Sequence, residues 1–152
     1  MHRSIRAAAL IAALALLLPA SALAAARQPT LGVTFDVHTV FGQSSVPFTA
    51  SGPAVDAGFV CPVGTVDDLS GSLIETRQGW TGQFVKEFTC TDGSGSFVVK
   101  LQVRLDKRGD NFSWTVLSGT DRYASLRGAG SGFGIGFEGG VEDYYAGQVR
   151  LG

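Results

Sequence analysis

The stretch that decides the fold is Gly128-Ala129-Gly130-Ser131-Gly132-Phe133-Gly134-Ile135-Gly136-Phe137, which follows Gly119-Thr120-Asp121-Arg122-Tyr123-Ala124-Ser125-Leu126-Arg127. Glycine occupies every second position from 128 to 136. Because the side chains of a β-strand alternate between its two faces, a strand here has one face of bare backbone. We expect it either to bend sharply, as a barrel wall does, or to let another group pack closely on that face. Trp114 and Tyr144 are the candidates for that group, and a bound ligand is the alternative.

The clearest signal outside this stretch is a β-hairpin. Residues 82–91 and 96–106 both predict strands, and Asp92-Gly93-Ser94-Gly95 between them is a typical tight turn. In the second strand apolar and polar residues alternate, which predicts one buried and one wet face. The residues expected to be buried are Phe97, Val99, Leu101, Val103 and Leu105, and those expected to be exposed are Lys100, Gln102 and Arg104.

Further strands complete an all-β domain. They are expected at residues 31–40, 46–50, 72–77, 111–118, 128–137 and 143–151, with turns at 67–71 and 107–110 and a short turn or single helical turn at 123–126. A meander of seven or eight antiparallel strands hides its edges by closing into a barrel or by stacking two sheets. The long strands and the glycine strand favour closure. We therefore predict a single antiparallel, closed or nearly closed β-barrel of about eight strands over residues 27–152, with no second domain.

The first 26 residues predict a signal peptide, which is cleaved and takes no part in the fold. A short basic segment, 1–6, precedes twelve apolar residues, 7–18, and a small-residue cleavage pattern that ends at Ala24. Cleavage is expected after Ala24 or Ala26. The apolar run is too short for a membrane anchor, which needs about 20 residues. We therefore expect a secreted protein with no membrane span after cleavage.

Cysteine usage agrees with export. Cys61 and Cys90 are the only two cysteines of the chain, and an even pair in an exported protein predicts a disulfide. Redox-active pairs usually lie closer together, as Cys-x-x-Cys. The bond would close a loop of about 30 residues, for which the chain-entropy model gives about 3–4 kcal/mol.

Composition and charge exclude several classes of function. The chain carries 12 basic and 13 acidic residues, and loss of Arg3 and Arg6 with the signal peptide leaves a net charge of −3. The charges are scattered, so there is no basic stripe for a nucleic acid. His38 alone cannot form a metal site and is expected to be an ordinary strand residue. The Gly-x-Gly-x-x-Gly string at 134–139 precedes strand-like sequence, whereas a dinucleotide site needs a helix there, so no cofactor is expected.

Lys86 raises the question of which polar group faces the lumen. A two- or four-residue hairpin loop places Lys86 on the same face as Phe97, whereas a three-residue loop with a bulge places Glu87 there. A buried lysine is costly unless it is paired, and such groups are often functional. The more ordinary interpretation is that Lys86 lies at the end of the barrel and extends its amine into solvent.

Four segments resemble the allene oxide cyclase-like barrel proteins, a superfamily related to plant dirigent proteins. The motif Gly119-Thr120-x-x-Tyr123-Ala124-x-Leu126-x-Gly128-x-Gly130 is similar to the S-G-T-G-x-Y-A-x-L-x-G-x-G pattern of that superfamily. Phe88-Thr89-Cys90-Thr91-Asp92-Gly93-Ser94-Gly95 resembles a hairpin of its exported bacterial branch, with Gly58-Phe59-Val60-Cys61 and Asp143-Tyr144-Tyr145-Ala146-Gly147 as the matching start and end. The resemblance implies an eight-stranded barrel with an apolar lumen. It carries over no catalytic residue, because the polar active-site residues of those proteins have no motif match here.

Three functions remain open. The first is a barrel that binds a hydrophobic small molecule without transforming it, the second is a cyclase, isomerase or dirigent-type protein, and the third is a structural or interaction protein with a filled lumen. Cavity volume separates the third from the others, and a lumen-facing Glu or Lys would favour the second. The residues expected to line a ligand cavity are Lys86, Phe88, Phe97, Val99, Leu101, Phe112, Trp114 and Tyr123. The oligomeric state stays open, with a homo-oligomer among the alternatives.

Overall fold

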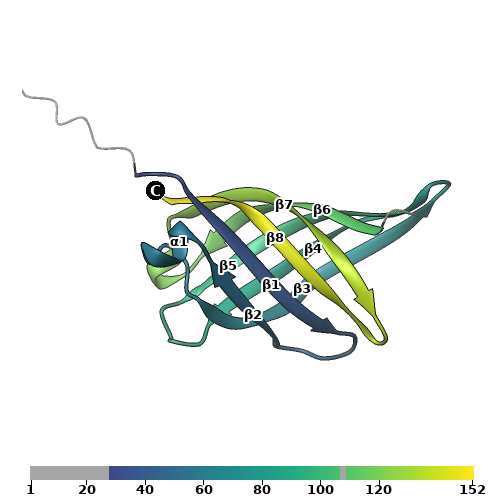
Figure 1. The fold of residues 1–152 in the computed structure, drawn as a ribbon, viewed down its shortest axis with the longest axis horizontal. Helices are drawn as coiled ribbons and strands as arrows, with labels where there is room; N and C mark the ends of the chain where they lie inside the picture. The colour runs from purple at the N-terminus through teal and green to yellow at the C-terminus, as the bar shows by residue number, and fades with distance from the viewer. Residues whose placement is uncertain (1–27, 107–108) are drawn as a thin grey trace, which may run out of the picture.

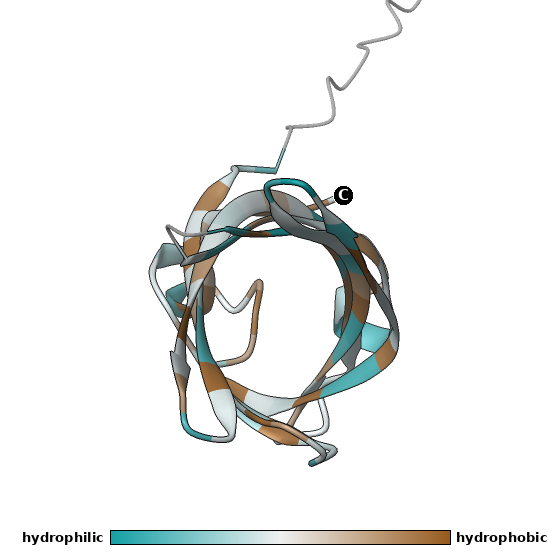
Figure 2. Cartoon of the chain, turned by 90° about the vertical axis from the view of Figure 1, so that its right-hand side faces the viewer, coloured by the Kyte–Doolittle hydropathy of each residue, from teal (hydrophilic) through white to brown (hydrophobic). Residues whose placement is uncertain are grey.

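The structure, a computed structural model, describes residues 28–106 and 109–152 and contains one closed antiparallel barrel of eight strands. Each strand pairs with the next along the chain, and β8 closes the barrel by pairing with β1 (Figures 1 and 2). The strands are β1 (Leu31–Val40), β2 (Val46–Ser51), β3 (Val63–Thr76), β4 (Gly79–Cys90), β5 (Ser96–Asp106), β6 (Gly109–Gly119), β7 (Leu126–Phe137) and β8 (Gly140–Leu151). The predicted fold is confirmed.

The connections divide the barrel into two different ends. The hairpins β1–β2, β3–β4, β5–β6 and β7–β8 lie at one end, which we call the open end. The helical turns α1 (Pro53–Asp56) and η1 (Asp121–Tyr123) and the β4–β5 turn lie at the other, which we call the closed end. In Figure 1 the open end is on the right, where the long β3–β4 hairpin projects, and α1 is on the left.

Two expectations concern segments outside the strands. The predicted signal peptide, residues 1–26, lies outside the described residues. In the part of the chain that the structure describes, no helix has the length and apolar character needed to cross a bilayer.

The alternation in β5 produces the predicted two faces. Its inward-facing residues Phe97, Val99, Leu101 and Val103 are buried, Leu105 is half-buried, and Gln102 and Arg104 are exposed. Two details of the prediction are wrong: Leu105 lies close to the open end and is therefore only partly covered, and Lys100 is half-buried. The even loop between β4 and β5 pairs Phe88 with Phe97, so both rings point into the barrel.

The bare face of the glycine strand β7 points inward, and at Gly130 it is covered by a tryptophan. A Cβ on Gly130 would lie 2.7 Å from Cε2 of Trp114, and one on Gly147 of β8 would also contact that ring. The indole Nε1 donates to the carbonyl oxygens of Ser131 and Ala146, each at 3.3 Å. Trp114 was predicted correctly, because only bare backbone leaves room for so large a side chain inside an eight-stranded barrel.

The other candidate for covering the glycine face, Tyr144, was wrong. Its side chain lies on the outside, where it stacks on Phe133 with 5.1 Å between ring centroids. Residues 144 and 133 are direct cross-strand partners on the outer face of β7 and β8. Side-chain parity along β8 therefore directs Tyr145, and not Tyr144, into the barrel.

The closed end is sealed by a disulfide and a tyrosine. Cys61 and Cys90 are bonded, with 6.0 Å between their Cα atoms, as predicted. The η1 turn directs Tyr123 onto the end of the barrel, where its ring packs edge-on against Phe97. The Tyr123 hydroxyl makes a 2.8 Å hydrogen bond with Oγ of Ser94 in the β4–β5 turn. This end of the lumen is therefore plugged by the protein itself.

The predicted turn at residues 67–71 is wrong, because β3 runs through this segment without a break. The pairing with β4 shifts between Asp68 and Ser70, which marks a β-bulge. Asp and Gly favour turns locally, but a strand can absorb one extra residue as a bulge while its neighbours stay paired. Here the bulge leaves Asp68 paired with Lys86, and it leaves Leu69 exposed on the outside.

Candidate functional site

The closed half of the lumen is filled by aromatic rings. Phe35 lies at the centre, with its ring centroid between 5.5 and 6.2 Å from those of Phe88, Phe97, Trp114 and Tyr145. Phe88 and Phe97 stack with 5.1 Å between centroids. These rings form a packed core, and the cavity described next lies in the open half of the barrel.

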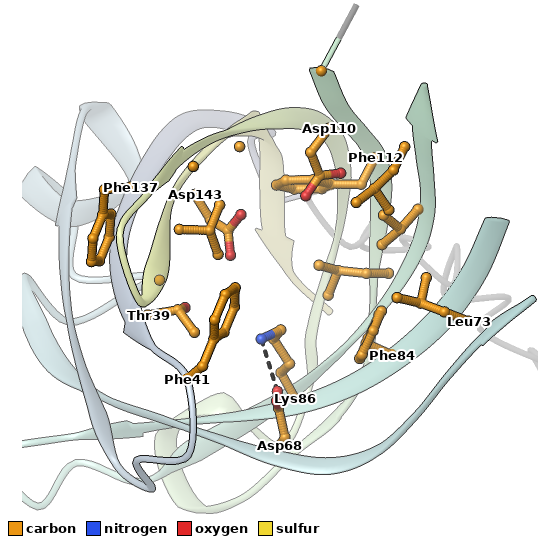
Figure 3. A pocket seen from close by; sticks show the side chains of 18 of the residues that line it. Thr39, Phe41, Asp68, Leu73, Phe84, Lys86, Asp110, Phe112, Phe137 and Asp143 are labelled. Atoms are coloured by element: carbon orange, nitrogen blue, oxygen red, sulfur yellow. Dashed lines mark ion pairs between the residues drawn. The ribbon is translucent and has the colours of Figure 1, made fainter. Parts of the chain in front are cut away.

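The open half contains a cavity of about 630 Å³, which we call the open-end cavity (Figure 3). Every strand except β2 contributes to its wall. The residues used below are Thr39, Asp68, Phe84, Lys86, Leu101, Val103, Asp110, Phe112, Gly134, Gly136 and Asp143. The exposed rings of Phe41 and Phe137 flank the entrance.

Toward the closed half of the barrel, the cavity ends at aromatic side chains that cover the bare backbone of β7. A Cβ added to Gly132 would overlap ring atoms of Phe112, so this ring packs directly on the backbone of β7. Phe112 in turn packs on Tyr145 with 4.7 Å between centroids. Nearer the entrance, a Cβ on Gly136 would meet nothing within 4 Å. The glycine strand therefore forms packed wall at Gly132 and open cavity wall at Gly136.

Lys86 lies in the wall of this cavity. The residue is only 7 % exposed, so the interpretation that its amine extends into solvent is wrong. Its Nζ makes a 2.8 Å ion pair with Asp68, which comes from the bulge in β3. The ammonium also lies 5.9 Å from the centre of the Phe84 ring. Burial of this lysine is thus compensated by a carboxylate and a ring face.

Two further carboxylates meet in the cavity at Gly134. Asp143 Oδ1 lies 2.9 Å, and Asp110 Oδ2 lies 3.0 Å, from the position that a Cβ on Gly134 would take. The absence of a side chain on this residue is what allows β6 and β8 to direct their carboxylates toward the same point. Figure 3 shows the Asp143 carboxylate pointing into the cavity, with the Lys86 amine on the opposite side.

The carboxylates of this pair are held in a poorly solvated environment. Burial raises the pKa of Asp143 from 3.8 to about 7; Lys86 opposes this rise, and Asp110, Asp68 and Glu142 add to it. Burial also raises the pKa of Asp110, again with Lys86 in opposition. Close to neutral pH, Asp143 can therefore gain or lose a proton.

Among the described residues, three buried polar atoms have no hydrogen-bond partner: Oγ1 of Thr39, Oδ1 of Asp110 and the hydroxyl of Tyr145. Thr39 and Asp110 line the open-end cavity, whereas Tyr145 belongs to the packed rings below it. Burial, followed by Asp143, raises the pKa of Tyr145 well above 10. A buried polar group without a partner costs about 1–3 kcal/mol. Such groups favour a ligand that brings hydrogen-bonding atoms of its own.

The sequence-predicted cavity residues fall into two groups. Lys86, Leu101 and Phe112 line the open-end cavity. Phe88, Phe97, Val99, Trp114 and Tyr123 do not, because they lie in the closed half, where they form the packed core. Sequence reasoning missed Asp68, Asp110 and Asp143. Asp110 lies two residues before Phe112 on β6, and Asp143 lies two residues before Tyr145 on β8. Because side chains two positions apart point to the same face of a strand, the inward position of these aromatic residues is the signal that could have identified both carboxylates.

His38 lies away from the cavity, on the outer wall. Its Nδ1 makes a 2.6 Å contact with Oε2 of Glu142, its cross-strand partner on β8, and its ring stacks on Phe137. Over residues 28–106 and 109–152 the structure brings no three His, Cys, Asp or Glu side chains into an arrangement that could hold a metal ion. Comparison with protein-family models, with curated proteins and with solved structures finds no match to this chain.

Proposed function

We propose that this protein is exported and that its open-end cavity binds a hydrophobic small molecule. The main support is the cavity itself, which has about 630 Å³ of space and walls that include Phe84, Leu101 and Val103. Small-molecule sites typically have volumes of about 300–1,000 Å³, mostly apolar walls and a few polar groups. The resemblance in sequence to barrels with an apolar lumen points to the same class of ligand.

The disulfide supports export. The bond between Cys61 and Cys90 is stable in oxidising compartments and rare in reducing ones. The signal-peptide pattern at residues 1–26 supports the same conclusion from the sequence. Mass spectrometry of the exported protein is expected to find an N-terminus after Ala24 or Ala26, and an intact Met1 would contradict export through this leader.

A cavity-filling variant tests the binding site. Gly136→Leu places an apolar side chain in the cavity, where a Cβ meets nothing within 4 Å. Gly32→Leu is the matched control, because Gly32 is also a strand residue with open space around its Cβ position but lies outside the cavity. We expect 1-naphthylmethanol, an uncharged fluorescent probe, to bind the wild type and Gly32→Leu and to lose at least tenfold in affinity for Gly136→Leu.

The binding proposal has two clear contradictions. Equal affinity in all three proteins would show that the probe binds elsewhere on the surface. Absence of saturable binding to the wild type would show that the cavity does not accept an apolar guest. Thermal melts of the three proteins accompany the titrations, because both leucines are expected to leave the fold intact.

A second candidate function is acid-catalysed isomerisation or ring closure of the bound molecule. It is favoured by the lumen-facing Lys86 and by Asp143, whose pKa of about 7 suits proton donation at neutral pH. The test is the rate of acid-catalysed opening of an aryl epoxide, such as 1-naphthyloxirane, in the presence of the protein. An isomerase is expected to accelerate this reaction, and Asp143→Asn to lose the acceleration while retaining binding. Equal rates with and without protein would leave binding as the function.

A further inference from the structure

We propose that the ligand of the open-end cavity is an apolar amine, whose ammonium group is held between Asp110 and Asp143. This inference rests on the proposed function, since it names the chemical class of the ligand for the same cavity. The two carboxylates would bind the ammonium group of the ligand, and the apolar wall of the cavity would contact the rest of the molecule.

The two carboxylates define a position for a cation. Asp143 Oδ1 and Asp110 Oδ2 lie 2.9 and 3.0 Å from the position that a Cβ on Gly134 would take, so the two carboxylates converge over this glycine from β8 and β6. Cγ2 of Val141 lies 2.8 Å from the same position, so a bound cation would lie farther into the cavity, between the two carboxylates. An ammonium group carries three donors, so it can bind both carboxylates and still retain one hydrogen for a third acceptor.

The second observation is that Asp143 is buried without a partner. The residue is 5 % exposed and its carboxylate points into the cavity (Figure 3). Within the described residues, no hydrogen bond or ion pair involves the side chain of Asp143. Among the described residues, the buried Oδ1 of Asp110, which lines the same cavity, also has no hydrogen-bond partner. Buried carboxylates normally have their acceptors satisfied, so this cluster matches a donor that enters from outside.

The charge of the cavity favours a cation over an anion. Among its described lining residues, Lys86 is the single basic group, and it already pairs with Asp68 at 2.8 Å. An acidic ligand would have to displace Asp68 and would face Asp110 and Asp143. A metal ion suits the cluster poorly, because no three acidic or histidine groups of the described residues converge as ligands. An organic ammonium needs only the two carboxylates and the apolar wall.

Three probes that share a naphthyl group and differ in their head group test whether the cavity prefers an amine, independently of whether it binds apolar molecules at all. They are 1-naphthylmethylamine, 1-naphthylmethanol and 1-naphthylacetate, titrated into the wild type by fluorescence and calorimetry at about pH 7.5. The affinity for the alcohol reports binding to the apolar wall of the cavity. The ratio of amine to alcohol affinity reports the contribution of the Asp110 and Asp143 carboxylates. We expect the amine to bind at least about ten times more tightly than the alcohol, and 1-naphthylacetate to bind most weakly of the three.

Single substitutions show which residues produce the preference for the amine over the alcohol. Asp143→Asn and Asp110→Asn are each expected to lower the ratio of amine to alcohol affinity from about tenfold to about one. Asp36→Asn removes the same charge from the outer face of β1 and is expected to retain the preference. Binding of the amine is also expected to release protons in wild type, measured from the buffer dependence of the binding enthalpy, and to release fewer in Asp143→Asn, where Asp110 is the remaining carboxyl of the pair.

The outcomes distinguish the two proposals. If the alcohol binds and the amine binds no better, the ligand class is wrong while the cavity remains a binding site. If 1-naphthylacetate binds most tightly of the three probes, the ligand class is also wrong, because Lys86 would then be the group that binds the ligand's charge. Should Asp36→Asn reduce the preference as much as Asp143→Asn does, the effect is general electrostatics and the carboxylate pair is not a site. If none of the three probes binds, the proposed function itself fails.

Discussion

Replacing Asp143 by asparagine should stabilise the barrel at about pH 8 and change its stability far less at about pH 4. The reason is that the folded chain holds this carboxyl in the cavity, where burial raises its pKa from 3.8 to about 7. Between these two values the folded chain keeps the proton while the unfolded chain has lost it. Stability contributed by the protonated form is therefore complete below pH 3.8 and is lost as the pH rises to about 7.

The magnitude follows from the difference between the two pKa values of Asp143. Each pKa unit corresponds to about 1.4 kcal/mol, so ionisation of this carboxyl costs the folded state roughly 4 kcal/mol above pH 7. Asparagine has nearly the same shape and cannot ionise. The difference in the free energy of unfolding between variant and wild type should therefore grow by roughly 4 kcal/mol from pH 4 to pH 8.

Urea unfolding at four pH values measures this difference. The fluorescence of Trp114, which is buried in the folded barrel, reports the transition. Asp36→Asn, on the exposed outer face of β1, is the control for removing a carboxylate outside the cavity. A constant offset for Asp143→Asn would refute the reasoning that burial dominates at this site. An offset that shrinks as pH rises would show that Lys86 outweighs burial and holds the carboxylate ionised.

Three further predictions test the rest of the architecture. Gly132→Val should lower the free energy of unfolding by about 1–3 kcal/mol, because its side chain would overlap a packed ring and a backbone carbonyl, and an unchanged urea midpoint would contradict that wall packing. Replacing both Cys61 and Cys90 by alanine should cost about 3–4 kcal/mol, as for a crosslink that spans 29 residues, and should leave the far-UV circular dichroism of the folded protein unchanged. Lys86→Met should raise the pKa of Asp143 further, because the lysine opposes the rise; NMR titration of the carboxyl carbon measures it, and a fall would contradict the proposed geometry.

The sequence by itself determined the features that depend on local pattern. The alternation from Phe97 to Val103 predicts which face of β5 is buried, because strand parity is a property of neighbouring residues. The Asp92-Gly93 turn predicts the hairpin but leaves two registers open, with either Lys86 or Glu87 facing inward, and only the observed strand pairing selects Lys86. The alternating glycines predict a wall that a large side chain covers, and Trp114 is that side chain. Even the disulfide follows from a count of two cysteines.

Only the tertiary structure decided where the lumen is filled and where it is open. The stagger of the strands around the barrel sets which inward residues share a level, and that stagger depends on all eight pairings together. It brings Asp110 and Asp143, which are 33 positions apart in the sequence, to the same glycine of β7. The bulge in β3 was equally invisible, because Asp67 and Asp68 favour a turn when only their neighbours are considered. The polar part of the site is therefore a product of barrel closure, since no local pattern places these carboxylates together.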